Sequence, residues 1–319
     1  MRRILFHAKP IVEPPVEPVP PRSARLEVLV PFILVTLIWV STWLVIRDQL
    51  TVVPPSWSVC YRFLVAGVVM LGWAAVRGDG LRLDRRGVLF AACLGLAQFV
   101  LNFNLVYRAE LYITSGVVAV VYALLLVPNA ILARLFLGQK MGPQLITGSV
   151  VAMGGVALLF LHEARLIAAG TGQAMMGIGA ALLGVLACST ANVMQATKIA
   201  KAYPMSTALG WAMLIGAGID AAFAWSTVGA PVIEMRWGYL AGILYLGVLG
   251  SALTFSIYYR LIRVIGPAKA AYTSVLIPVI AMLLSTIFEG YRWSPLAGAG
   301  AVLVMAGLVI ALRARRPNR

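Results

Sequence analysis

Ten apolar stretches, each long enough to cross a bilayer as a helix, constrain the fold of this 319-residue chain more than any other feature. A helix of roughly 17 to 25 apolar residues spans the hydrocarbon core. The chain is 61% hydrophobic and only 12% charged, about half the charged fraction of a soluble domain. The pattern therefore predicts an all-helical, polytopic membrane protein. The stretches lie at 28–46, 56–76, 87–106, 114–135, 144–161, 175–196, 206–226, 237–259, 268–288 and 295–312.

Two segments of the chain repeat nearly the same phrase. FLGQKMGPQLITGSVVAMGGVALLF occupies 136–160, and FEGYRWSPLAGAGAVLVMAGLVIAL occupies 288–312. A turn, a proline and two glycines at fixed spacing are hard to obtain from membrane composition alone, so the match indicates a duplication. A gapless overlay pairs Phe136/Phe288, Gly138/Gly290, Pro143/Pro295, Gly148/Gly300, Val150/Val302, Met153/Met305 and Gly155/Gly307.

Each phrase ends a set of five predicted spans. Because five is odd, the second set must enter the membrane in the opposite sense, which predicts ten transmembrane helices arranged as two inverted five-helix repeats. Secondary transporters use such repeats because two near-equivalent halves can open a central site to alternate sides. The glycines of the two phrases form small-residue stripes, for which we predict a role in helix packing: Gly148, Gly155, Gly300 and Gly307.

The net charge of +15 indicates topology rather than a nucleic acid partner. With a cytoplasmic N-terminus, 20 of the 26 Lys and Arg lie in cytoplasmic segments and five in outer loops, with Arg62 inside a span. Cytoplasmic loops of membrane proteins carry this excess. The distribution predicts a multi-pass membrane protein with both termini in the cytoplasm.

These observations predict five segments along the chain. Residues 1–27 form a disordered, Pro-rich cytoplasmic tail, 28–161 the first repeat and 162–174 an outer linker. Residues 175–312 form the second repeat and 313–319 a basic cytoplasmic tail. All three cysteines fall inside predicted spans, where a thiol acts as a small apolar side chain. No disulfide, metal site or cofactor is expected.

Several stretches resemble the drug/metabolite transporter superfamily, EamA-like family. They are LIWVSTW (37–43), YRF (61–63), LNFNLVYRAELYITSGVVAVVYALLLVPNAILARLFLGQKMGPQLITG (101–148) and AAYTSVLIPVIAMLLSTIFEGYRWSP (270–295). The resemblance extends over nearly all of 28–312. It implies ten helices, with spans 1, 3, 4, 6, 8 and 9 lining a central cavity and spans 5 and 10 at the periphery.

Polar and aromatic side chains form stripes on the spans that the resemblance places around this cavity. Polar groups are costly in lipid and so face partners or a cavity, although a Tyr or Trp near a span end is commonly an interface anchor. Amides and aromatic rings without acids suit a zwitterionic or apolar solute. The residues that we predict to bind substrate are Trp39, Trp43, Gln98, Asn102, Tyr122, Asn192, Gln195, Tyr258 and Tyr272.

Two charged residues, Arg62 and Asp220, lie well inside spans 2 and 7, at similar distances from the outer end. An unpaired charge at that depth is expensive, so we predict an ion pair with a structural or gating role. Direct contact with substrate or a proton is the alternative for either residue.

The sequence thus predicts a secondary transporter that exports small metabolites. Among EamA-like proteins, the cavity residues are most similar to those of exporters of aromatic and other neutral amino acids. A multidrug or paraquat-type efflux carrier is the alternative, and a central carboxylate for organic cations is missing. An enzyme is not expected, because no paired acids, activated nucleophile or metal ligands occur together. The expected partners are a small-molecule substrate and the lipid bilayer, with no nucleic acid, for a chain that acts as a monomer.

Overall fold

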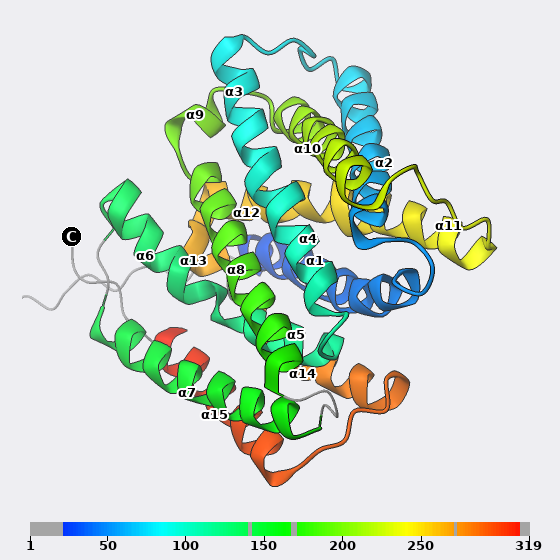
Figure 1. Cartoon of the computed structure of the whole chain (residues 1–319). Coiled ribbons are helices and arrows are strands. Elements are labelled where there is room, and N and C mark those ends of the chain that lie inside the picture. Colours follow the sequence, from blue (N-terminus) through cyan, green and yellow to red (C-terminus); the bar gives the residue numbers. More distant parts are fainter. Residues whose placement is uncertain (1–21, 140–141, 167–170, 271–272, 313–319) are drawn as a thin grey trace, which may run out of the picture.

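The computed structural model describes residues 22–139, 142–166, 171–270 and 273–312, and every regular element in them is a helix (Figure 1). The first half contains α1 (Arg22–Gln49), α2 (Pro55–Val76), α3 (Arg85–Leu94), η1 (Gly95–Asn102), α4 (Phe103–Ala109), α5 (Ser115–Tyr122), η2 (Ala123–Leu125), α6 (Leu126–Leu137) and α7 (Pro143–Leu166). The second half contains α8 (Thr171–Gln195), α9 (Lys198–Lys201), α10 (Met205–Val228), α11 (Trp237–Leu244), η3 (Tyr245–Leu253), α12 (Thr254–Ile265), α13 (Pro267–Ala270), α14 (Thr273–Phe288) and α15 (Pro295–Leu312).

Helices in this fold lie over the predicted apolar stretches. Six are long and apolar enough to cross a membrane, and two shorter apolar helices occur at Ile146–Leu159 and Pro295–Gly307. The remaining two stretches, 28–46 and 268–288, fall within α1 and across α13 and α14. The chain is therefore a multi-pass membrane protein. Predicted residue Tyr272 lies outside the described residues.

The duplicated turn has the same backbone geometry in both copies. Gly138 and Gly290 follow α6 and α14 with φ values of 67° and 66°, a left-handed conformation that glycine adopts without steric penalty. The next residue closes the turn in each case, since Gln139 N donates to Ala133 O at 3.3 Å and Tyr291 N to Ser285 O at 3.2 Å. This bond pattern is that of a Schellman helix end.

The last helices of the two halves, α7 and α15, pack against each other along these glycines (Figure 1). A Cβ atom added at Gly155 would lie 2.6 Å from the Gly300 carbonyl oxygen, and one at Gly300 would lie 2.9 Å from that of Gly155. Gly307 faces Ala152 and the Gly148 carbonyl. Since residues later in α15 meet residues earlier in α7, the two helices run antiparallel.

The second helices of the halves, α2 and α10, form a similar antiparallel pair. Gly67 packs against Leu214, and Gly210 packs against Leu71, so the order of contacts is again reversed. Glycine at each contact lets the two helix backbones approach closely. Corresponding helices of an inverted repeat meet in this way around a shared axis.

The third helix of each half is interrupted by a π-helix, η1 in the first and η3 in the second. Each π-helix lies against the second helix of the opposite half: Gly95 of η1 packs on Ala212 of α10, and Gly247 of η3 packs on Val65 of α2. The two halves are thereby interlocked. The same spacing as in the duplicated phrase pairs Leu94/Leu246, Gly95/Gly247, Leu101/Leu253, Phe103/Phe255, Tyr107/Tyr259 and Arg108/Arg260.

The α7–α15 contact predicts that alanine at Gly155 lowers stability, whereas alanine at the neighbouring Gly154 is tolerated. We expect Gly155→Ala to destabilise the protein by about 1–3 kcal/mol, because the added methyl group overpacks the contact with α15. Gly154→Ala is the matched control, since nothing lies within 4 Å of a Cβ there. Thermal unfolding of the purified variants in one detergent measures both. Equal melting temperatures for the two variants would contradict the packing described.

Candidate functional site

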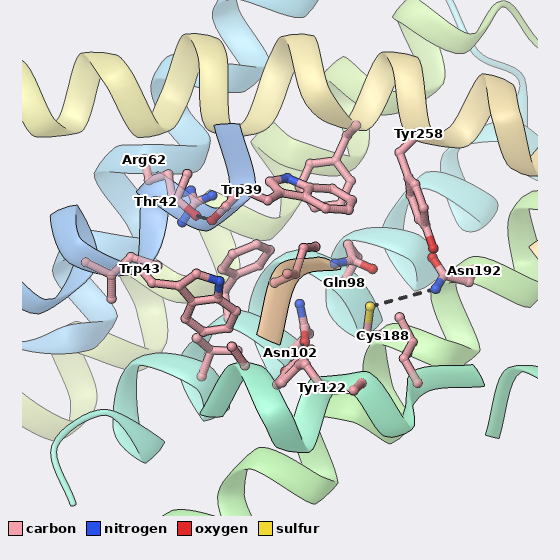
Figure 2. A pocket seen from close by; sticks show the side chains of 18 residues that line it. Trp39, Thr42, Trp43, Arg62, Gln98, Asn102, Tyr122, Cys188, Asn192 and Tyr258 are labelled. Carbon is pink, nitrogen blue, oxygen red and sulfur yellow. Dashed lines mark hydrogen bonds between the residues drawn. The ribbon is translucent and has the colours of Figure 1, made fainter. Parts of the chain in front are cut away.

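A small cavity lies at the centre of the bundle, between helices of both halves (Figure 2). Its volume is about 100 Å³, below the range of roughly 300–1,000 Å³ typical of ligand pockets. In this conformation the cavity is therefore too small for a typical metabolite. Its walls consist of Trp39, Thr42, Trp43, Ile46, Arg62, Gln98, Asn102, Phe103, Val106, Ala119, Tyr122, Ala123, Leu125, Cys188, Asn192, Phe255, Tyr258 and Ile277.

Aromatic rings form much of the wall. Trp39 of α1 packs on Tyr258 and Phe255 of α12, with ring centroids 4.9 and 5.6 Å apart. Its indole Nε1 donates to Thr254 Oγ1 at 3.0 Å, which fixes the ring against α12. Trp43, one turn later on α1, packs edge-on against Tyr122 of α5 at 5.9 Å. The indole nitrogen of Trp43 is buried and has no hydrogen-bond partner among the described residues.

Three predicted amides face the same cavity (Figure 2). Gln98 and Asn102 project from η1, where the π-helical turn sets their orientation. Asn102 Oδ1 accepts a hydrogen bond from Tyr122 at 2.6 Å, and Gln98 Oε1 accepts one from Tyr259 at 3.1 Å. Asn192 of α8 donates to Asn129 at 3.4 Å, while its own Oδ1 has no partner among the described residues. Tyr122 and Tyr259 thus orient Asn102 and Gln98. The amide oxygen of Asn192 is left without a donor among the described residues.

Arg62 of α2 reaches the cavity wall, in line with the alternative to the predicted ion pair. The side chain is 1% exposed. Its Nε donates to Ser251 Oγ at 2.9 Å and its Nη2 to the Gly250 carbonyl at 3.3 Å, both on η3. The guanidinium carbon lies 4.4 Å from the Phe103 ring centroid. Tyr107 also lies within hydrogen-bonding reach of the guanidinium, and Nη1 has no well-aligned acceptor among the described residues, which leaves a buried donor at the cavity.

The predicted ion pair between Arg62 and Asp220 is not formed in this structure. Asp220 Oδ1 instead accepts a hydrogen bond from Asn104 Nδ2 of α4 at 2.7 Å. The two charged residues lie on helices in contact, but Arg62 points to η3 and Asp220 to α4. Similar depth in the membrane therefore did not bring the groups together, because helical rotation turned them toward different neighbours. No acidic side chain lines the cavity within the described chain.

The remaining predicted site residues lie elsewhere. Gln195, at the end of α8, accepts a hydrogen bond from Arg263 at 3.1 Å and does not line the cavity. The four packing glycines lie on α7 and α15, also outside its walls. Phe255 was missed as a wall residue. Its pairing with Phe103 across the repeats is a sequence signal that would have indicated it.

Separate partners for Arg62 and Asp220 predict additive effects on stability. We expect the unfolding free energies lost in Arg62→Met and Asp220→Asn to add in the double variant to within about 0.5 kcal/mol, as for residues without shared partners. Unfolding of the three variants in mixed micelles measures this cycle. If the double variant loses less unfolding free energy than the sum of the two single losses, by more than about 1 kcal/mol, the result would support a direct ion pair between Arg62 and Asp220.

Comparison with known proteins agrees with the fold. Protein PagO of Salmonella typhimurium is 24% identical over 291 residues, which cover 91% of this chain and 94% of PagO. The uncharacterized inner membrane transporter YedA of Escherichia coli K12 is 28% identical over 280 residues, covering 86% of this chain and 88% of YedA. A solved structure titled only as the crystal structure of a protein has a TM-score of 0.66 at 18% identity, over 93% of this chain and 100% of its own, which shows a shared fold.

The model of the EamA-like transporter family matches residues 28–161 and 175–313. These two matches coincide with the two halves that pack through antiparallel helix pairs. Since they include most of the sequence, the chain belongs to the EamA-like transporter family.

Proposed function

We propose that this protein exports neutral and aromatic amino acids across the bacterial inner membrane by alternating access. In this proposal the chain acts as a monomer with ten membrane spans in two inverted repeats, and both termini lie in the cytoplasm. The antiparallel pairing of α2 with α10 and of α7 with α15 supports the inverted arrangement. The excess of Lys and Arg on one side supports the orientation, and relatives such as YedA are inner membrane transporters by name.

One observation carries the choice of substrate: a buried guanidinium donor faces an aromatic cavity that lacks acids. Arg62 Nη1 and Trp43 Nε1 both lack partners among the described residues, and both side chains line the cavity. A buried charge without a counter-ion is expensive. Guanidinium groups bind carboxylates through short, charge-assisted hydrogen bonds. A substrate carboxylate at Arg62 would therefore supply both the missing charge and the missing acceptor.

The other walls suit the rest of an amino acid. Its ammonium group needs oxygen acceptors, and the wall offers the amide oxygens of Gln98, Asn102 and Asn192. A neutral amide binds a zwitterion without adding a second buried charge. The rings of Trp39 and Tyr258 are suited to an aromatic or aliphatic side chain.

The packing of the repeats supports alternating access. The π-helix η3 carries Ser251 and Gly250, which bind Arg62, and η1 carries Gln98 and Asn102. Each π-helix lies on the second helix of the other half. A movement between the halves would therefore shift both binding groups together. π-Helical turns of this kind occur frequently at functional sites.

A multidrug or paraquat-type efflux carrier remains the second candidate. Its substrates are organic cations, which the Arg62 guanidinium would repel at short range. Among the described residues that line the cavity, none carries a carboxylate that could attract them. The electrostatics of the cavity therefore favour the amino acid proposal.

Transport by the purified protein in liposomes tests the proposal. We expect saturable uptake of radiolabelled phenylalanine, tryptophan and threonine by the wild type. Arg62→Gln should lower phenylalanine uptake at least tenfold, because a hydrogen bond to a charged group contributes about 1.5–3 kcal/mol. Arg263→Gln is the matched control, since Arg263 is also partly buried but binds Gln195 away from the cavity.

Two results would sink the proposal. One is equal phenylalanine uptake by the Arg62→Gln and Arg263→Gln variants, in proteoliposomes that hold equal amounts of folded protein. The other is movement of a cationic dye without movement of any of the three amino acids.

A further inference from the structure

Glu110 occupies an unusual position at one end of the bundle, between α4 and α5. It follows the membrane-spanning segment Arg85–Ala109, yet its side chain is 0% exposed. Both carboxyl oxygens are buried and have no hydrogen-bond partner among the described residues. Buried carboxylates normally accept several hydrogen bonds, and an unsatisfied one is costly. A proton on Glu110 would remove most of that penalty.

A second acid, Glu289, provides the contrast. It follows α14 and accepts a hydrogen bond from Ser285 Oγ at 2.7 Å. It also accepts from the backbone N–H of Ser115 at 3.1 Å and from the Ser115 hydroxyl. These bonds join the end of α14 to the first turn of α5. Of these two acids, Glu289 has hydrogen-bond donors, whereas the Glu110 carboxyl has none among the described residues.

The ionisable groups around Glu110 come from α1, α2, α4, α5 and the end of α14. Arg47 of α1 donates to the Glu110 backbone carbonyl, and Arg62 of α2 and Glu289 after α14 also act on the carboxyl electrostatically. Tyr107 of α4 and Tyr122 of α5 complete the set. Burial is the main cause that raises the pKa of Glu110 well above its usual range, and Glu289 adds to it, while Arg47 and Arg62 oppose it.

We propose that Glu110 is a proton-binding site whose proton holds this end of the bundle closed. The described conformation buries the carboxyl completely, so it retains a proton taken from water. Separation of α5 from α14 would expose the group to solvent, where it ionises as an ordinary glutamate. The carboxyl O–H is the only covalent bond that breaks in this step, and the hydrogen bonds from Ser115 to Glu289 open as α5 and α14 separate.

The sign of the pH dependence follows from linkage. The closed state binds more protons than the open state because burial favours the neutral acid. Low pH therefore favours the closed end, and the closed state is lost as pH rises through the pKa that Glu110 has in it. Since Arg62 and Tyr122 also line the central cavity, the proton acts close to the transport path.

Infrared difference spectroscopy of the full chain in liposomes tests the proton site without any transported substrate. We expect the wild type to show the C=O stretch of a protonated carboxylic acid that disappears as pH is raised. This band should be absent in Glu110→Gln and retained in Asp48→Asn. Asp48 is the matched control, because it is an acid near the same end but pairs with Arg236 and is 48% exposed. A band unchanged in Glu110→Gln would overturn the proposal.

Pulsed electron resonance between spin labels tests the closure. The labels are attached at Leu111→Cys and Phe288→Cys, two exposed positions on the two sides of the closed end. The parent for this experiment lacks the native cysteines, so the measured distance is the one between these two labels. A longer distance should appear as pH rises, in the parent and in Asp48→Asn. Glu110→Gln should abolish this response, and Arg47→Gln should shift it to higher pH. A response that persists in Glu110→Gln, or none in the parent, would refute the gate.

Discussion

Close antiparallel contact between corresponding helices of the two halves is the constraint on which the structure depends. Glycines at the α7–α15 and α2–α10 crossings let the helix backbones meet. The same pairing sets each π-helical third helix against the opposite half, as Gly95 on α10 and Gly247 on α2 show. The central cavity therefore has walls from both repeats (Figure 2). A rearrangement of the halves cannot leave the cavity unchanged, which is the property that alternating access requires.

Three buried ionisable side chains, Asp220, Arg62 and Glu110, have different partners in the bundle. Asp220 is held by Asn104 within the protein, away from the cavity wall. Arg62 is held on two of its three nitrogens by η3, and its third nitrogen is left for an acceptor in the cavity. Glu110 lies at one end with no donor and carries a raised pKa. Since none of the three forms a direct ion pair in the described chain, each is free to respond to a ligand, a proton or a change of conformation.

Much of the fold followed from the sequence, because membrane spans require long apolar stretches and the duplicated turn requires glycine at Gly138 and Gly290. The spacing of polar and aromatic residues along the spans also indicated that Trp39, Asn102 and Asn192 face a common cavity, and all three line it. Rotation about a helix axis was harder to predict. The π-helical turns η1 and η3 change the direction in which the side chains of each third helix point. Arg62 accordingly donates to Ser251 of η3 and does not pair with Asp220 of α10. Glu110 was overlooked because a residue in a short connection is expected to be solvated, whereas packing of the surrounding helices buries it.

In the proposed transport mechanism, Arg62 binds the carboxylate of an amino acid in the aromatic cavity. Competition against radiolabelled phenylalanine uptake in proteoliposomes tests it most directly, with two analogues that each keep the ring and one charged group. Phenylpropionate keeps the carboxylate, and phenethylamine keeps the amine. We predict that phenylpropionate competes and that phenethylamine does so weakly, because only the carboxylate pairs with the guanidinium. Competition by phenethylamine alone would contradict the account and favour an organic cation carrier.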